Sequence, residues 1–418
     1  MIDLDSFHEI ATSLARHKLR TALTAVGVFF GLLIFMLMVA FGTSLHDGIN
    51  RKMSGFATNA VFVWGQRTSE PYAGLPPNRQ VAFDNDDIEP LRRLAGIEHV
   101  APRNMLGGFR AGNVVKRGSK VGSYQVAGDY PAFQYVSLPL MRFGRFIDDG
   151  DITERRKVAV IGETVASELF PGGEDPIGSA VQINGIHFVV IGVFGTRVTG
   201  QRGDGMVRTI HVPFSTFQQA FHMGHRVGFF ALTGEAGQDA SALEQRVYAL
   251  LRERHKVAPT DQAAMGGRNM GAQFAKTEKM FNAIDFVLAF FGLLSLLAGA
   301  IGVSNIMLIS VRERTKEIGV RKALGARPVS VVAMVVAESV MLTTLAGYLG
   351  LVIGTFSISF FADYVATLGP EFPLAPPRIS FEFALFATGA LIVIGALAGL
   401  IPAARAAAIS PVEALRDE

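Results

Sequence analysis

Four long stretches of the chain contain no charged side chain and consist largely of apolar residues. Each is long enough to cross a hydrocarbon core of about 30 Å as a helix. They run over residues 21–45, 286–311, 339–362 and 383–404. With the helical turns that flank them, we predict transmembrane helices at residues 21–45, 281–311, 328–362 and 383–404. The expected fold class is therefore an α-helical membrane protein with four transmembrane helices.

The region between the first two spans, residues 46–280, mixes apolar and polar positions instead. Residues 181–193 alternate on both sides of an Asn-Gly dipeptide, which predicts a β-hairpin. Residues 241–254 repeat apolar side chains on one face of a helix. We therefore predict an α+β extracytoplasmic domain of two lobes, in which the glycine-rich residues 196–205 form a mobile loop or an insertion.

Basic residues indicate which side of the membrane each end occupies, because Lys and Arg are enriched in cytoplasmic loops. Arg16, Lys18 and Arg20 directly precede the first span. The N-terminus is therefore expected in the cytoplasm. Residues 1–20 also carry apolar side chains at helical spacing, which predicts an interfacial helix leading into the first span.

Counting the crossings from this end orients the rest of the chain. Residues 312–327 and the tail 405–418 fall on the cytoplasmic side; the first segment is basic, and the tail carries Arg405 and Arg416. Residues 46–280 and the loop 363–382 fall outside. The chain is thus expected in the cell (inner) membrane as a multi-pass protein, with both termini in the cytoplasm and the large domain outside.

Residues 310–327 are too charged to lie in lipid, since they contain six basic and two acidic side chains. Glu317 stands four residues before Arg321, an order that supports a helix. Gly325 suits the left-handed position that ends a helix, and Pro328 suits the first turn of the next. We predict a short amphipathic helix along the inner membrane face. On composition alone, a simple anchor that touches only lipid headgroups remains an equal alternative.

Small residues recur four apart in the spans, a spacing that lets helices approach closely in lipid. The candidates for packing within the chain, or for a dimer seam, are Gly27, Gly31, Gly302, Gly350 and Gly354. Glu338 lies about ten residues into the third hydrophobic stretch, and a carboxylate at membrane depth suggests function. If that helix extends two turns into the cytoplasm, Glu338 is only interfacial, which is the reading we favour.

The composition narrows the classes further. Half of the 418 residues are hydrophobic and 18% are charged, which is unusual for a soluble protein. The net charge is +3, and the bases gather near the ends of apolar stretches, so nucleic-acid binding is not indicated. The chain has no cysteine, which excludes disulfides and thiolate metal sites.

Sequence motifs for catalysis are lacking. The chain has no P-loop motif, so any ATP has to be bound by a partner. His222 and His225 are the only close histidine pair, and we interpret them as surface residues, not metal ligands. We predict a non-catalytic chain with no catalytic residue, no metal site and no cofactor of its own.

Three groups of motifs carry a family resemblance. Residues 311–326, Val-Arg-Glu-Arg-Thr-Lys-Glu-Ile-Gly-Val-Arg-Lys-Ala-Leu-Gly-Ala, resemble the signature that follows the second span in MacB/FtsX-like ABC transporter permeases. Residues 402–416 are similar to the closing motif of that family. Within the large domain, Val-Ala-Val-Ile-Gly at 158–162 and Asp-Pro-Ile-Gly at 175–178 look like the periplasmic core of MacB-type proteins. The resemblance covers nearly the whole chain and is strongest to the MacB and LolC/LolE branch.

This resemblance implies a permease subunit that couples ATP hydrolysis to movement of its periplasmic domain. The partners implied are a separate cytoplasmic ABC ATPase dimer, which binds ATP and Mg, and a second permease subunit, identical or related. Membrane lipids surround the spans. The residues to which the resemblance assigns coupling to the ATPase are Arg312, Glu313, Arg314, Glu317, Arg321 and Gly325.

Three functions remain open within this family. One is export of a periplasmic substrate, together with a periplasmic adaptor and an outer-membrane duct. The others are lipoprotein release, as in LolC/LolE, and FtsX-like regulation of an envelope enzyme. FtsX-like chains usually have a small outer domain, so the size of residues 46–280 favours the first two functions. The substrate itself is not indicated by the sequence.

Overall fold

The computed structural model describes residues 18–53, 55–108, 112–198, 200–369, 372 and 374–410. Most of the interfacial helix expected over residues 1–20 lies outside the described residues, as does most of the tail at 405–418. The chain divides into two compact units. We call Met1–Gly48 with Phe281–Glu418 the helical unit, and Ile49–Met280 the sheet unit.

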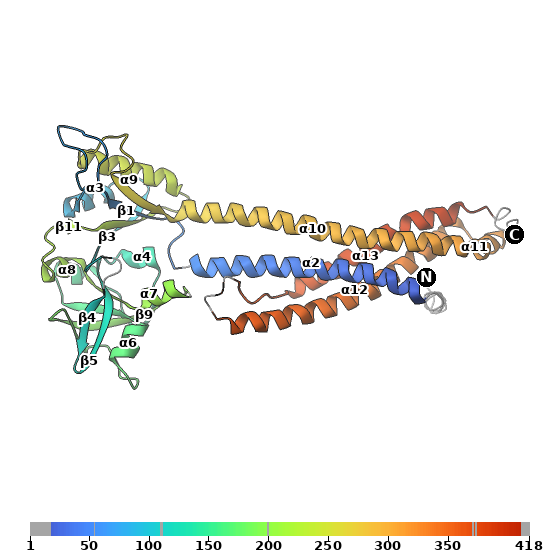
Figure 1. Cartoon of the computed structure of the whole chain (residues 1–418), viewed down its shortest axis with the longest axis horizontal. Helices are drawn as coiled ribbons and strands as arrows, with labels where there is room; N and C mark the ends of the chain where they lie inside the picture. Colours follow the sequence, from blue (N-terminus) through green and yellow to red (C-terminus); the bar gives the residue numbers. More distant parts are fainter. Residues whose placement is uncertain are drawn as a thin grey trace. The chain divides into compact units, whose positions relative to one another are not determined.

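Within the described residues, four helices are long and apolar enough to cross a membrane (Figure 1). They are α2 (Lys18–Met53), α10 (Met270–Glu313), α12 (Pro328–Thr367) and α13 (Phe381–Ala408). Large apolar side chains such as Phe286, Phe356 and Phe381 are exposed on them, as expected for surfaces that face lipid. The predicted class of four membrane helices is confirmed. The helices are longer than predicted, and α10 starts at Met270 instead of residue 281.

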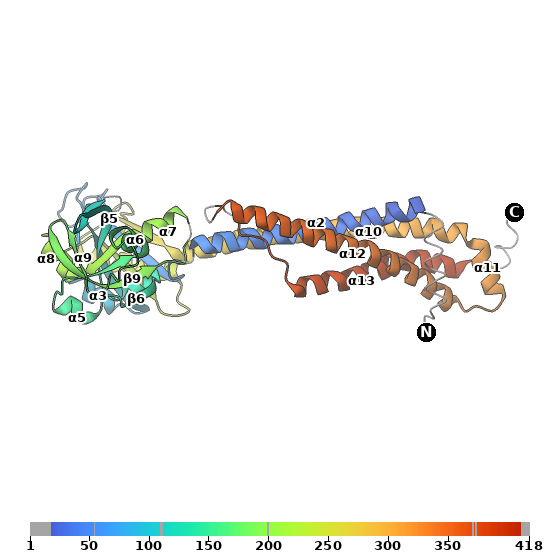
Figure 2. The same ribbon diagram turned by 90° about the horizontal axis from the view of Figure 1, so that it is seen from below.

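Helices α12 and α13 lie side by side in both views of the molecule (Figures 1 and 2). Small residues make this approach possible. The hydroxyl of the buried Ser339 donates a hydrogen bond to the backbone oxygen of Gly395 at 2.7 Å. A Cβ on Gly399 would lie 2.9 Å from the Cβ of Ser339, closer than real carbon contacts. These two helices therefore pack backbone against backbone, as small residues allow in lipid.

In the part of the chain that the structure describes, the sheet unit is built on one mixed sheet of eleven strands. These are β1 (Ala60–Gly65), β3 (Ile97–Met105), β4 (Asn113–Arg117), β5 (Lys120–Asp129), β6 (Leu140–Gly144), β7 (Val158–Gly162), β8 (Ala180–Ile183), β9 (Ile186–Gly195), β10 (Thr209–Pro213), β12 (Phe229–Gly234) and β13 (Met265–Asn269). A separate pair is formed by β2 (Phe83–Asp84) and β11 (Arg226–Val227).

The strand order closes part of this sheet on itself. Strands β10, β7, β9, β8, β4 and β5 are neighbours in that order, and β10 pairs again with β5 in parallel. Strands β3, β12, β1 and β13 extend the sheet from the other edge of β5. The long β5 therefore belongs to both a closed ring of strands and an open sheet. The sheet unit thus combines a barrel-like part and an open part that share β5.

Short helices cover these strands. They are η1 (Asn85–Asp87), α3 (Ile88–Arg92), α4 (Phe133–Ser137), α5 (Asp149–Thr153), α6 (Glu163–Leu169), α7 (Gln201–Val207), α8 (Phe214–Ala220) and α9 (Ala240–Arg254). One apolar core lies within the ring, around Tyr124 and Phe188. Another lies between the open sheet and helices α3 and α9, around Leu91 and Val247. The predicted α+β class is confirmed, and the ring and the open sheet each have an apolar core.

The local predictions agree with this structure except at the glycine-rich segment. The hairpin is β8–β9, and the helix predicted over residues 241–254 is α9. Within residues 196–205, predicted as a mobile loop or an insertion, helix α7 begins at Gln201. A Cβ at Gly203 would overlap the backbone oxygen of Val198, so this glycine lets the helix fold back tightly onto the preceding turn.

Candidate coupling site at the α11 turn

A short helix, α11 (Thr315–Ala323), follows α10 almost directly. The face of α11 that packs against α10 and α12 is apolar. Its Ile318 is buried in the same cluster as Val311 of α10 and Val331 of α12. The helix is shorter than the predicted segment 312–327. Arg312 and Glu313 are the last residues of α10, and residues 324–327 form the turn that leads into α12.

The end of α11 is formed as the sequence predicts. Gly325 has a φ of 98°, which is readily available only to glycine. The amide of Ala326 donates to the oxygen of Arg321 at 3.0 Å, and the amide of Gly325 donates to that of Lys322 at 3.1 Å. These two bonds form a Schellman motif. Pro328 then occupies the first turn of α12, so the reversal of the chain is short and well defined.

Ion pairs among the described residues hold this turn together and connect it to α12. Glu317 pairs with Arg314 at 3.1 Å and with Arg321 at 3.1 Å. Arg314 also pairs with Glu338 of α12 at 3.3 Å. Glu338 is only 4% exposed, so it is neither a free carboxylate at the membrane surface nor a lipid-facing group. Its position joins the predicted coupling segment to the third membrane helix.

Lys322 connects α11 to the fourth membrane helix. Its Nζ donates to the backbone oxygens of Ala407 at 2.8 Å and Ile409 at 2.6 Å, at the carboxyl end of α13. A cation at this end is favourable, because the last carbonyl groups of a helix lack partners within it. Sequence reasoning did not single out Lys322, since its partners lie 85 and 87 residues away and leave no local pattern.

The opposite face of the turn is exposed and carries both basic and apolar side chains. Leu324 is 84% exposed and Val329 is 75% exposed. Arg312, Lys316 and Arg327 are exposed beside them. A face that combines exposed apolar and basic side chains is typical of a protein contact surface.

The predicted packing glycines fall into two groups. A Cβ on Gly31 would lie 2.9 Å from the oxygen of Ser295 in α10, and one on Gly350 would lie 3.1 Å from the oxygen of Phe29 in α2. Gly354 similarly faces the sulfur of Met36. A Cβ on Gly27 or Gly302 would meet no described atom within 4 Å. The first three therefore lie at contacts between helices of one chain, whereas the last two face open space.

The histidines that drew attention in the sequence are not assembled into a site. His222 and His225 are both exposed. Within the described ranges, no group of three or more His, Asp or Glu side chains is placed to hold a metal ion.

A buried charged cluster in the sheet unit was not signalled by any motif. The carboxylate of Asp129 contacts Arg103 at 3.0 Å and His211 at 2.6 Å. Burial lowers the pKa of the His211 imidazole, although its hydrogen bond with Asp129 opposes this change. A neutral imidazole beside one cation and one anion keeps the cluster uncharged as a whole. Residues on three different strands form it, so only the folded sheet brings them together.

The chain matches two family models. Residues 21–250 match the MacB-like periplasmic core domain, and residues 289–411 match the FtsX-like permease C-terminal domain. The macrolide export ATP-binding/permease protein MacB of Rhodospirillum rubrum is 31% identical over 97% of this chain and 59% of its own length. The pyoverdine export ATP-binding/permease protein PvdT of Pseudomonas entomophila is 28% identical over 96% of this chain and 58% of its own length. The chain thus spans less than two thirds of each of these relatives.

The periplasmic region of MacB from Actinobacillus actinomycetemcomitans, known from a crystal structure, is 18% identical with a TM-score of 0.43. This alignment covers 54% of the present chain and 95% of that region.

Proposed function

Because the chain belongs to the MacB-like and FtsX-like family of ABC permeases, we propose that it is the membrane subunit of a MacB-type transporter. In this proposal a cytoplasmic ATPase dimer binds ATP and Mg and drives the subunit from inside. The chain itself performs no catalysis. Both termini lie in the cytoplasm and the sheet unit lies outside, as the distribution of basic residues supports.

The observation that carries this proposal is the attachment of α11 to two membrane helices. Arg314 binds Glu338 of α12, and Lys322 binds the end of α13. A force applied to the exposed face of α11 therefore reaches several helices together. A helix anchored only by lipid headgroups would not need these internal contacts, so they favour coupling over the simple anchor.

Helix α10 supplies a path from the turn toward the sheet unit. It runs without interruption from Met270 to Glu313, about 66 Å at 1.5 Å per residue. Its first residue follows strand β13 directly, and its last residue is separated from α11 only by Arg314. A rigid helix can transmit displacement along its length. We propose that movement of α11 changes the conformation of the sheet unit in this way.

The proposed cargo is a periplasmic substrate that is exported. Support comes from the relatives, which are named for macrolide and pyoverdine export. The transporter would then include a second permease subunit, identical or related, and an adaptor with an outer-membrane duct. Lipoprotein release and FtsX-like regulation remain the alternative functions within the family.

The test uses the full chain reconstituted in lipid with the ATPase that co-purifies with it. Leu324→Asp places a charge on the exposed face of the turn without touching the core. Arg321→Glu reverses the charge opposite Glu317. Both variants should insert normally but lose most of the stimulation of ATP hydrolysis. Val121→Asp, at another exposed apolar position in β5, is the matched control and should retain it.

Normal stimulation in Leu324→Asp would show that this face does not contact the ATPase. Failure to recover any ATPase with the wild-type chain would contradict the transporter assignment itself. Loss of stimulation in Val121→Asp as well would show that the assay reports general damage.

A further inference from the structure

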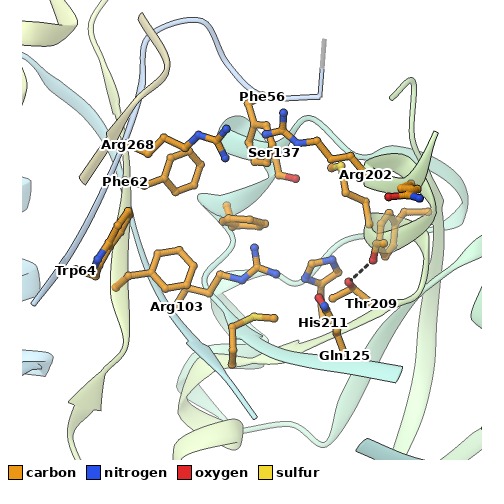
Figure 3. A pocket seen from close by; sticks show the side chains of 17 residues that line it. Phe56, Phe62, Trp64, Arg103, Gln125, Ser137, Arg202, Thr209, His211 and Arg268 are labelled. Atoms are coloured by element: carbon orange, nitrogen blue, oxygen red, sulfur yellow. Dashed lines mark hydrogen bonds between the residues drawn. The ribbon is translucent and has the colours of Figure 1, made fainter. Parts of the chain in front are cut away.

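The sheet unit contains a cavity of about 690 Å³. Residues from strands β1, β3, β5, β9, β10, β12 and β13 and from helices α4 and α7 line it (Figure 3). Its volume lies within the range of about 300 to 1,000 Å³ that is typical of small-molecule sites. The cavity lies wholly within one unit, so it is a feature of the folded sheet domain.

Six of the seventeen residues that line the cavity carry Phe or Trp rings. The rings that line it belong to Phe56, Phe62, Trp64, Phe133, Phe194 and Phe229. Met105 and Met206 add flexible apolar surface. Burying the apolar body of a ligand against these rings is favourable in free energy. The rings can pack against either flat aromatic groups or acyl chains.

Three arginines bring positive charge to this apolar space. Figure 3 shows the side chains of Arg103, Arg202 and Arg268 around the cavity. The described lining residues include no Asp or Glu. Arg103 is balanced from behind by Asp129, and its guanidinium lies 4.0 Å from the centre of the Phe133 ring.

Among the described residues, no carboxylate pairs with Arg202 or Arg268 in the way that Asp129 pairs with Arg103. Among the described residues neither forms an ion pair, and the guanidinium of Arg202 lies over the ring of Phe56 at 4.8 Å. Partial burial, and then the neighbouring charge of Arg268, lower the pKa of Arg202. Two cations held near each other without an acid repel, and an anion placed between them would remove that repulsion.

From this arrangement we infer that the cavity binds an organic anion with an apolar body, its charge held by Arg202 and Arg268 and its body by the aromatic wall. The inference concerns binding alone and does not depend on the proposed transport function. The same chemistry suits an acyl anion that comes from the membrane and a soluble aromatic anion. A membrane source is considered because two lining residues are close in the chain to membrane helices: Phe56 follows the end of α2 closely, and Arg268 stands two residues before α10.

The sequence provides its own reporter, since Trp64 is the only tryptophan of the chain and lines the cavity. Full-length protein in lipid nanodiscs, without ATPase or ATP, is titrated with brominated compounds that quench tryptophan emission. One arm uses 11-bromoundecanoate and its neutral counterpart 11-bromoundecanol. The other arm uses a water-soluble bromonaphthalenesulfonate. Saturable quenching by an anion, with none by the alcohol, is the expected result, and the arm that saturates at lower concentration identifies the source.

Charge-removing variants test the assigned groups. Arg202→Gln and Arg268→Gln should each raise the dissociation constant of the anion about tenfold, the effect of one charged hydrogen bond. Arg93→Gln, at an exposed arginine of the same unit, should leave it unchanged. An unshifted Trp64 emission maximum shows that each variant is folded. Equal quenching by the alcohol and the acid, or unchanged affinity in both arginine variants, would overturn the inference.

Discussion

Arg314 and Glu338 form an ion pair of 3.3 Å although 24 residues separate them in the sequence. Arg314 stands at the start of α11, and Glu338 lies buried within α12. The pair explains why a carboxylate occurs at this depth in an otherwise apolar helix, because a buried charge is tolerated when it has a partner. It also identifies one contact through which the turn and the membrane helices move together.

Removing the charge of Glu338 should loosen this connection. Glu338→Gln keeps the volume of the side chain but gives the Arg314 guanidinium a neutral amide as its partner in place of a carboxylate. We expect a loss of about 1 to 3 kcal/mol in the free energy of unfolding, seen as a lower melting temperature in detergent. Glu382→Gln, at an exposed position of α13, is the control and should leave the melting temperature unchanged. Equal melting temperatures for both variants would mean that the pair contributes nothing to stability.

Lys322 should contribute to stability through the end of α13. Lys322→Met removes the donor to the oxygens of Ala407 and Ile409 while keeping a long apolar chain. The expected cost is about 1 kcal/mol, and hydrogen exchange should speed up in the last turn of α13. Lys316→Met, at an exposed lysine of the same helix, should change neither. Faster exchange in both variants would point to a general effect of lost charge.

The glycines of the helical unit should respond differently to a larger side chain. Gly350→Val forces a branched side chain against the backbone of α2 and should destabilise the protein by about 1 to 3 kcal/mol. Gly302→Val meets open space within the chain and should have little effect on thermal unfolding. If a second subunit packs on the face of Gly302, cross-linking between subunits should fall in that variant alone. Equal destabilisation by both substitutions would contradict the assigned contacts.

The stability of the sheet unit should fall as the pH drops below about 6.5. The folded state keeps His211 neutral, since burial lowers its pKa, whereas the unfolded chain binds a proton there at about pH 6.5. Between these two pKa values the unfolded state holds more protons, so acid favours unfolding. Asp129 and Arg103 face the imidazole, and the desolvated cluster has little room for another charge.

This prediction can be measured as the melting temperature at about pH 7.5 and about pH 5.5. His211→Asn should show a smaller decrease between these values than the wild-type protein. Asp87 and Asp151 do not contribute to the decrease in melting temperature over this pH range. Hydrogen bonds from His255 and Arg254 to Asp87, and from Arg145 to Asp151, outweigh burial and keep both pKa values below 3.8. Their contribution is lost only at lower pH. An identical decrease in both proteins would assign the pH dependence to other groups.

The sequence predicted the features that depend on near neighbours along the chain. The membrane helices follow from uninterrupted apolar stretches, and the hairpin β8–β9 follows from alternation around an Asn-Gly turn. The end of α11 follows from Gly325, whose φ of 98° few other residues adopt. At residues 196–205 the local pattern did not indicate helix α7, where Gly203 permits close packing against the backbone of Val198.

The sequence by itself determined the class of the protein, its four membrane helices and the position of its charged turn. Each of these depends on spacing or composition within a few residues, where side-chain chemistry acts directly on the backbone and on lipid. Only the tertiary structure decided what Glu338 and Lys322 bind, and which strands place Arg103 beside Asp129 and His211. Those contacts join segments far apart in the chain, and their geometry depends on how every intervening element packs.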